Sequence, residues 1–122
     1  MDVKTTFLHG NLTEDVYMIQ SEGFVDLTST SKVCKLKRSI YGLRQASRSW
    51  NIHFDEVVTS LGFIKSEEDA CLYKKLSGSS IVFFISYVDD ILLIGNDVSM
   101  LNSVKESLNG KFSMKDLGEA VY

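Results

Sequence analysis

The chain has 122 residues, enough for one domain with a single hydrophobic core. Hydrophobic residues make up 44% and charged residues 24%, a balance that excludes a disordered or fibrous protein. The longest apolar run, residues 81–88, is far shorter than the roughly 20 residues that cross a bilayer, and the first residues lack a secretory signal. We therefore expect an intracellular protein with no membrane partner.

The net charge of −3 is unlike that of a typical nucleic-acid binder, but the basic residues are unevenly distributed. No acidic residue lies between Asp26 and Asp55, and six of the thirteen basic residues fall in this segment. The segment could bind a phosphate-bearing anion, or it could be a solvated basic face without a ligand. The six residues are Lys32, Lys35, Lys37, Arg38, Arg44 and Arg48.

The two cysteines, Cys34 and Cys71, are isolated in the sequence, as are His9 and His53. There is no Cys-x-x-Cys pair and no His at ligand spacing, so the pattern indicates neither a zinc site nor a disulfide framework. Unpaired cysteines are usually buried, and we expect both to be small core residues.

Short strands are expected around residues 3–8, 16–20 and 33–36. A helix is expected from about Ser47 to Leu61, because its apolar residues recur on one helical face, and Gly62 should end it. That face should pack against a sheet. Its residues are Trp50, Phe54, Val57, Val58 and Leu61.

Two hairpins that share a strand are expected next. Residues 71–76 and 81–87 are rich in β-branched and aromatic residues and flank the turn residues 77–80. Residues 88–90 then interrupt the apolar pattern before it resumes at 91–94, which indicates a second tight turn.

The last predicted element is a helix with Asp97 as its N-cap. Leu101, Val104, Leu108 and Phe112 recur at helical spacing and should face the sheet. Together these elements predict one α+β domain, an antiparallel sheet with helices packed on one face.

Asp89 and Asp90 are adjacent carboxylates between two strongly apolar strands. Burying an unpaired charge there would cost several kcal/mol, so these side chains either face water in an ordinary turn or bind a cation. An isolated Asp-Asp pair would favour the ordinary turn.

Five sequence blocks, taken together, favour the other interpretation. They are residues 1–10, 15–18, 39–50, 87–90 and 112–118, and they span essentially the whole chain. In content and order they resemble the reverse transcriptases of copia-type retrotransposons. Residues 1–10 look like the block with that family's first catalytic aspartate, and Tyr-Val-Asp-Asp at 87–90 resembles its catalytic tetrapeptide.

The resemblance implies that residues 1–122 are part of a reverse transcriptase domain, a ferredoxin-like polymerase palm that uses two-metal nucleotidyl transfer. It makes Asp2 and Asp89 the metal-bridging pair and Asp90 a weaker third ligand, holding two Mg²⁺ ions, with Mn²⁺ as a substitute. Two such ions lie roughly 4 Å apart, so the Asp2 and Asp89 carboxylates should lie within about 8 Å at one edge of the sheet.

The resemblance also implies a nucleotide site. Phe7 matches the aromatic residue that stacks under the incoming sugar and excludes a ribose 2′-hydroxyl, although it could instead be a core aromatic in a strand. Gln45 matches a residue that contacts the incoming nucleotide. Arg44 and the basic residues near it could face the triphosphate or template, and Tyr87 belongs to the tetrapeptide.

The chain departs from the family at several positions. Family members commonly carry proline where this chain has Ser21 and Ala70, often also at Ser47, and alanine at Thr6. The chain has no proline, although average usage of about 5% predicts roughly six. Such a pattern is typical of a decaying genomic copy, and the alternative to an enzyme is an inactive transposon-derived remnant.

The implied partners are an RNA or DNA template with its primer, deoxynucleoside triphosphates, and the remainder of a Pol polyprotein. Fingers should precede Asp2, and a primer-gripping segment, thumb and ribonuclease H should follow Tyr122. The isolated fragment should therefore be inactive. The expected location is the cytoplasm, in a virus-like particle, or the nucleus.

Overall fold

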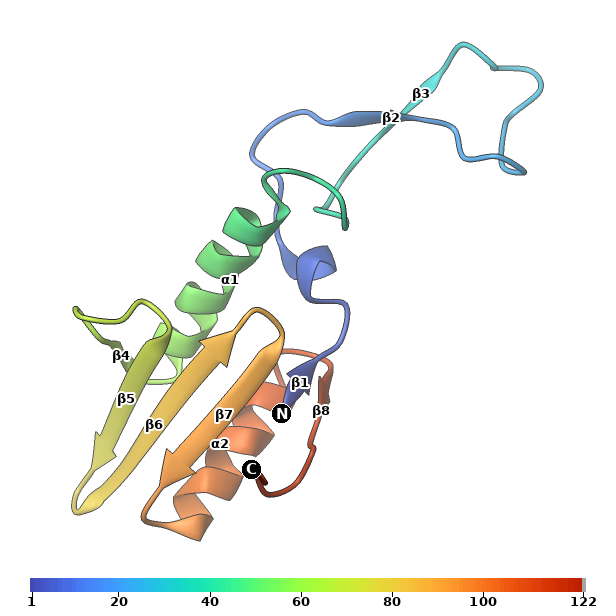
Figure 1. Cartoon of the computed structure of the whole chain (residues 1–122). Coiled ribbons are helices and arrows are strands. Elements are labelled where there is room, and N and C mark those ends of the chain that lie inside the picture. The colour runs from blue at the N-terminus through green and yellow to red at the C-terminus, as the bar shows by residue number, and fades with distance from the viewer. Residues whose placement is uncertain (122) are drawn as a thin grey trace. The chain divides into compact units, whose positions relative to one another are not determined.

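The computed structural model describes residues 1–121, which form two compact units (Figure 1). The sheet unit comprises residues 1–6 and the chain from Phe54 onward, and the hairpin unit comprises Phe7–His53. The boundary falls within helix α1 (Ala46–Ser60), which begins in one unit and ends in the other.

The sheet unit contains a six-stranded antiparallel sheet in which the first strand of the chain lies between later ones. The hairpin predictions for residues 71–94 are confirmed, because β5, β6 and β7 pair consecutively. In sheet order the strands are β4 (Ile64–Lys65), β5 (Leu72–Ser77), β6 (Ser80–Tyr87), β7 (Asp90–Gly95), β1 (Asp2–Val3) and β8 (Met114–Lys115).

Helix α2 (Val98–Asn109) lies against β6 and β7 on one face of this sheet, as Figure 1 shows. Phe54, from the second half of α1, has its ring 5.5 Å from that of Phe84 on β6 and 5.8 Å from that of Phe112. The core therefore contains a cluster of aromatic rings between the sheet and the helical segments. The expected α+β class, with an antiparallel sheet and helices, is confirmed.

The opposite face of the sheet carries exposed apolar side chains. Ile64 is 63% exposed, Leu76 64%, Leu92 40% and Ile94 49%. They alternate along their strands with the buried residues of the core face, as the two-residue period of a strand requires. We call this surface the outer face.

The end of α1 and the start of α2 agree with the sequence predictions. Gly62 adopts φ +86° and donates to the Thr59 carbonyl at 2.9 Å, while Phe63 donates to Val58, the pattern of a Schellman motif. The Asp97 carboxylate caps α2 by accepting hydrogen bonds from the backbone N–H groups of residues 99 and 100. Phe112, however, lies beyond the end of α2, although it is buried.

The strand predicted over residues 3–8 is wrong. The strand stops at Val3, Thr5 adopts φ +53°, and a 3-10 helix, η1 (Thr6–His9), follows. Thr6 is buried, and its hydroxyl donates to the Val3 carbonyl at 2.9 Å. That bond satisfies the one polar group of the buried Thr6 side chain.

In the hairpin unit, β2 (Tyr17–Ile19) and β3 (Val33–Lys35) pair as an isolated two-stranded sheet, close to their predicted positions. The connecting loop is held by Gln20, whose side-chain amide donates to two loop carbonyls and accepts from Asp26 N–H. Trp50 also belongs to this unit, where it is buried with its ring 6.0 Å from that of His9.

The expectation of buried cysteines is wrong. Cys34 lies on β3, an exposed strand of the two-stranded sheet, and Cys71 lies at the entry to β5. Both are exposed. Within residues 1–121, no helix is long and apolar enough to span a membrane.

Candidate catalytic site

Asp2 and Asp90 are opposed on neighbouring strands. The Met1 amino group donates to the Ile91 carbonyl and the Ile91 N–H donates back to Met1, both at 2.7 Å. The next pair along, Asp2 and Asp90, is therefore a non-hydrogen-bonded pair, the type in which facing side chains come closest. Residues from distant parts of the sequence thus place two carboxylates side by side.

Both carboxylates belong to the outer face. Their strand neighbours Val3 and Ile91 are buried in the core, so alternation directs Asp2 and Asp90 to the other side. Tyr87, which is 76% exposed, pairs with Asp90, and on the far side Asp2 pairs with a lysine. We call this line the charged row; in order it contains Tyr87, Asp90, Asp2 and Lys115.

Asp89 lies in the two-residue turn that joins β6 to β7, directly beside the charged row. Its carbonyl accepts a hydrogen bond from the Val3 N–H at 2.9 Å, which ties the turn to β1. The other turn residue, Val88, has φ +57°, as the first central position of a type II′ turn requires. A β-branched residue is strained in this conformation.

The carboxylates fit a hard divalent cation in their donor chemistry. Mg²⁺ prefers oxygen ligands and completes its shell with water and substrate phosphates, so a site needs only a few protein carboxylates. The pair of Asp2 and Asp90 supplies two. Among residues 1–121, however, no three His, Cys, Asp or Glu side chains are gathered in an arrangement that could hold a metal ion. The structure thus opposes two of the three predicted ligands without forming the expected cluster.

The remaining predicted nucleotide-binding residues belong to the hairpin unit. Phe7 lies in η1 with its ring centroid 4.8 Å from that of Tyr41. Gln45 is partly buried immediately before the first residue of α1, and Arg44 beside it is exposed. The neighbouring basic side chains, Lys37, Arg38 and Arg48, are exposed as well.

Sequence reasoning gave no role to Tyr41 or Lys115. Both lie inside blocks that resemble the family, and a two-residue strand such as β8 is too short to show a period. Only the register of β1 against β8 shows that Lys115 neighbours Asp2.

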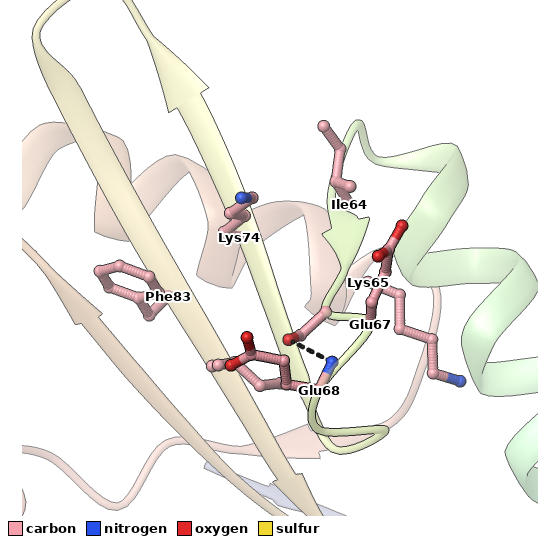
Figure 2. Close-up of a pocket in the computed structure, with 8 residues that line it drawn as sticks. Ile64, Lys65, Glu67, Glu68, Lys74 and Phe83 are labelled. Atoms are coloured by element: carbon pink, nitrogen blue, oxygen red, sulfur yellow. Dashed lines mark hydrogen bonds between the residues drawn. The ribbon is translucent and has the colours of Figure 1, made fainter.

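Away from the predicted site, the sheet unit has a hollow of about 440 Å³ (Figure 2). Ile64, Lys74 and Phe83 lie on three adjacent strands of its floor, and Glu67 and Glu68 lie on its flank. None of the residues singled out in the sequence lines it. It is a separate feature of the sheet.

A partly buried hydrogen-bond network links α1 to β4 and β5. The Asp55 carboxylate accepts hydrogen bonds from the Lys65 ammonium and the Tyr73 hydroxyl, each at 2.8 Å. Burial is the main cause that raises the pKa of Tyr73 to about 12, and the hydrogen bond to Asp55 is the second. The bond to Lys65 lowers the pKa of Asp55, and the same bond raises the pKa of Lys65. This network stabilises the scaffold that carries the charged row.

Comparison with known proteins identifies similar sequences over the full length of the chain. Residues 1–122 match the family model described as reverse transcriptase (RNA-dependent DNA polymerase). The chain is 43% identical over 122 residues to the retrovirus-related Pol polyprotein from transposon RE1 of Arabidopsis thaliana, covering all of this chain and 8% of that protein.

Two further Pol polyproteins are similar. The one from transposon TNT 1-94 of Nicotiana tabacum is 44% identical over 121 residues, covering 98% of this chain and 9% of the relative. The one from transposon RE2 of Arabidopsis thaliana is 41% identical over 116 residues, covering 95% and 8%. The chain thus spans less than a tenth of these relatives. No solved structure matches it.

Proposed function

Because the chain belongs to the reverse transcriptase (RNA-dependent DNA polymerase) family, we propose that it is part of the ferredoxin-like palm of a retrotransposon polymerase. In this proposal the complete protein copies RNA into DNA by two-metal nucleotidyl transfer. The observation that carries the proposal is the opposition of Asp2 and Asp90 on β1 and β7, with Asp89 in the adjoining turn.

Asp2, Asp89 and Asp90 would hold the two divalent ions, Mg²⁺ or Mn²⁺, in concert with substrate phosphates. Such ions activate a primer 3′-hydroxyl and offset charge on the departing pyrophosphate. The chain's own contribution is positional. Hydrogen bonds from β1 to β7 fix the spacing of the carboxylates before substrate arrives, which is how a scaffold preorganises a site.

The hairpin unit would contact the nucleotide and the template in this proposal. The Gln45 side chain precedes α1 and can donate to the nucleotide, and Phe7 supplies an apolar ring against the sugar. Arg44 and its exposed basic neighbours carry the positive charge that phosphates require. Tyr87, exposed at the end of the charged row, would also contact the nucleotide.

We further propose that the chain works as one segment of a Pol polyprotein, whose other parts hold template and primer, in a cytoplasmic particle or the nucleus. The relatives that support this are more than ten times its length. Polymerisation depends on holding primer, nucleotide and ions in a reactive geometry, which corresponds to effective molarities of about 10⁵ M or more. The segment alone should therefore not extend a primer.

The test is extension of a DNA primer on an RNA template by a purified longer protein that contains this segment. Extension should require a divalent ion and fall at least about 100-fold in Asp89→Asn. The matched control Glu106→Gln removes an exposed carboxylate on α2 and should leave the rate unchanged. No extension by the longer protein would support the inactive-remnant alternative. Equal extension by Asp89→Asn would show that Asp89 is not a catalytic metal ligand.

A further inference from the structure

The hairpin unit holds two aromatic rings together at its surface. Phe7 and Tyr41 have ring centroids 4.8 Å apart with planes inclined at 55°, a favourable geometry for aromatic pairs. Phe7 is partly buried, whereas Tyr41 is 56% exposed. The side chain of a tyrosine in a tight turn can extend into water, but the Tyr41 ring packs against the Phe7 ring instead.

The backbone on both sides of the pair is fixed. Tyr41 occupies the first central position of a turn closed by the Leu43 N–H to Ile40 carbonyl bond, and Gly42 supplies the required positive φ of +91°. This is the pattern of a type II turn. A β-carbon at residue 42 would be strained, so the turn depends on glycine.

The segment that carries Phe7 is joined to the segment before this turn. Gly10 donates to the Phe7 carbonyl at 3.2 Å, and its own carbonyl accepts from the Ser39 N–H at 3.0 Å. Asn11 and Arg38 form the adjoining β-bridge. A β-carbon on Gly10 would lie 3.0 Å from α1, so glycine permits this close approach. Two backbone segments distant in sequence thus present the two rings at a fixed spacing.

We propose that Tyr41 is a positioning residue for nucleotide selection, whose ring fixes the orientation of the Phe7 ring. The inference rests on the proposed function, in which Phe7 excludes the 2′-hydroxyl of a ribonucleotide. A phenyl ring that can rotate away would admit that hydroxyl. Tyr41 removes this freedom by packing against the ring, and an aromatic pair of this kind favours the packed orientation by about two- to tenfold.

The test measures kcat/KM for a deoxynucleoside and the matching ribonucleoside triphosphate in the longer protein. Tyr41→Ala should lower the preference for the deoxynucleotide by about two- to tenfold while retaining deoxynucleotide incorporation, which also shows that the variant folds. Tyr41→Phe keeps the ring and should keep the preference. Tyr17→Ala removes a tyrosine of similar exposure, 54%, in the same unit and should also keep it.

Phe7→Val distinguishes failure of this inference from failure of the proposed function. If Phe7→Val abolishes the preference and Tyr41→Ala does not change it, Tyr41 has no positioning role while the proposed function stands. If Phe7→Val leaves the preference intact, the selecting role of Phe7 fails and this inference fails with it. The contact itself is testable without activity: ring-proton NMR shifts of Phe7 in the chain should change in Tyr41→Ala and persist in Tyr41→Phe.

Discussion

Asp2 and Asp90 face each other across β1 and β7 in a non-hydrogen-bonded pair, so two like charges lie on one side of the sheet. Like charges directly opposite in a sheet are destabilising by roughly 0.2–1 kcal/mol. A cation bound between the two carboxylates would offset this repulsion and so stabilise the folded chain.

In the absence of divalent ions, Asp90→Asn should raise the free energy of unfolding of the chain by a few tenths to about 1 kcal/mol. Added Mn²⁺ should raise the melting temperature of the unsubstituted chain and not that of Asp90→Asn, because binding to the folded state alone stabilises it. Thermal unfolding with EDTA and with Mn²⁺ measures both, and Glu106→Gln is the control. A metal response retained in full by Asp90→Asn would show that the ion binds elsewhere.

The turn beside this pair stores strain, because Val88 has a φ of +57°. Strain at such a residue is of order 1–3 kcal/mol, and glycine relieves it at an entropic cost of roughly 0.5–1 kcal/mol. Val88→Gly should therefore stabilise the chain by about 1 kcal/mol in urea unfolding. Val121→Gly, at a position that is 96% exposed, should be neutral. A destabilised Val88→Gly would mean that contacts of the valine side chain outweigh the strain.

The Asp55 network predicts a loss of stability in alkali. The pKa of Tyr73 is about 12 in the folded protein against about 10 for a free tyrosine, so the folded state retains a proton that the unfolded state loses. This contribution is complete below pH 10 and is lost as pH rises through 12. Lys65, with its raised pKa, acts in the same direction.

Tyr73→Phe should cost about 1 kcal/mol near pH 8 through the lost hydrogen bond to Asp55, and the difference from the unsubstituted chain should shrink above pH 10. Urea unfolding at pH 8, 10 and 11.5 measures it. Tyr87→Phe, at a largely exposed position, should show no such trend. A Tyr73→Phe effect that is constant with pH would contradict the raised pKa.

The outer face predicts self-association of the chain. Exposed apolar patches of this kind mark surfaces that other structure covers, or that aggregate when uncovered. Replacing both Leu92 and Ile94 by lysine should reduce concentration-dependent association in analytical ultracentrifugation. Val98→Lys, at a 73% exposed position on α2, should not. A double variant that associates as strongly as the unsubstituted chain would show that the chain does not self-associate through the outer face.

The sequence predicted long elements and missed very short ones. The hairpins of β5, β6 and β7 and the two amphipathic helices carry clear two-residue and 3.6-residue periods, and they are present. The two-residue strands β1, β4 and β8 carry no period, so their places in the sheet could not be inferred. The strand expected at residues 3–8 failed because Thr5 reverses the backbone into η1.

In the candidate site, too, the sequence predicted some features and not others. The resemblance singled out Asp2, Asp89 and Asp90, but a one-residue change of register moves a side chain to the other face of a sheet. Only the hydrogen bonds from Met1 to Ile91 show that Asp2 opposes Asp90. Likewise, the contact between Phe7 and Tyr41 depends on how η1 and a turn pack, which no local pattern encodes.

The central claim, that these carboxylates are metal ligands of a polymerase, is tested most directly by exchanging a hard ligand for a soft one. Asp2→Cys in the longer protein should lower RNA-templated primer extension with Mg²⁺ by at least about 100-fold, because a thiolate is a poor ligand for magnesium. A thiophilic ion such as Cd²⁺ should restore extension in Asp2→Cys and not in Asp2→Ser. Full activity of Asp2→Cys with Mg²⁺, or equal responses of the two variants to Cd²⁺, would contradict metal binding at Asp2.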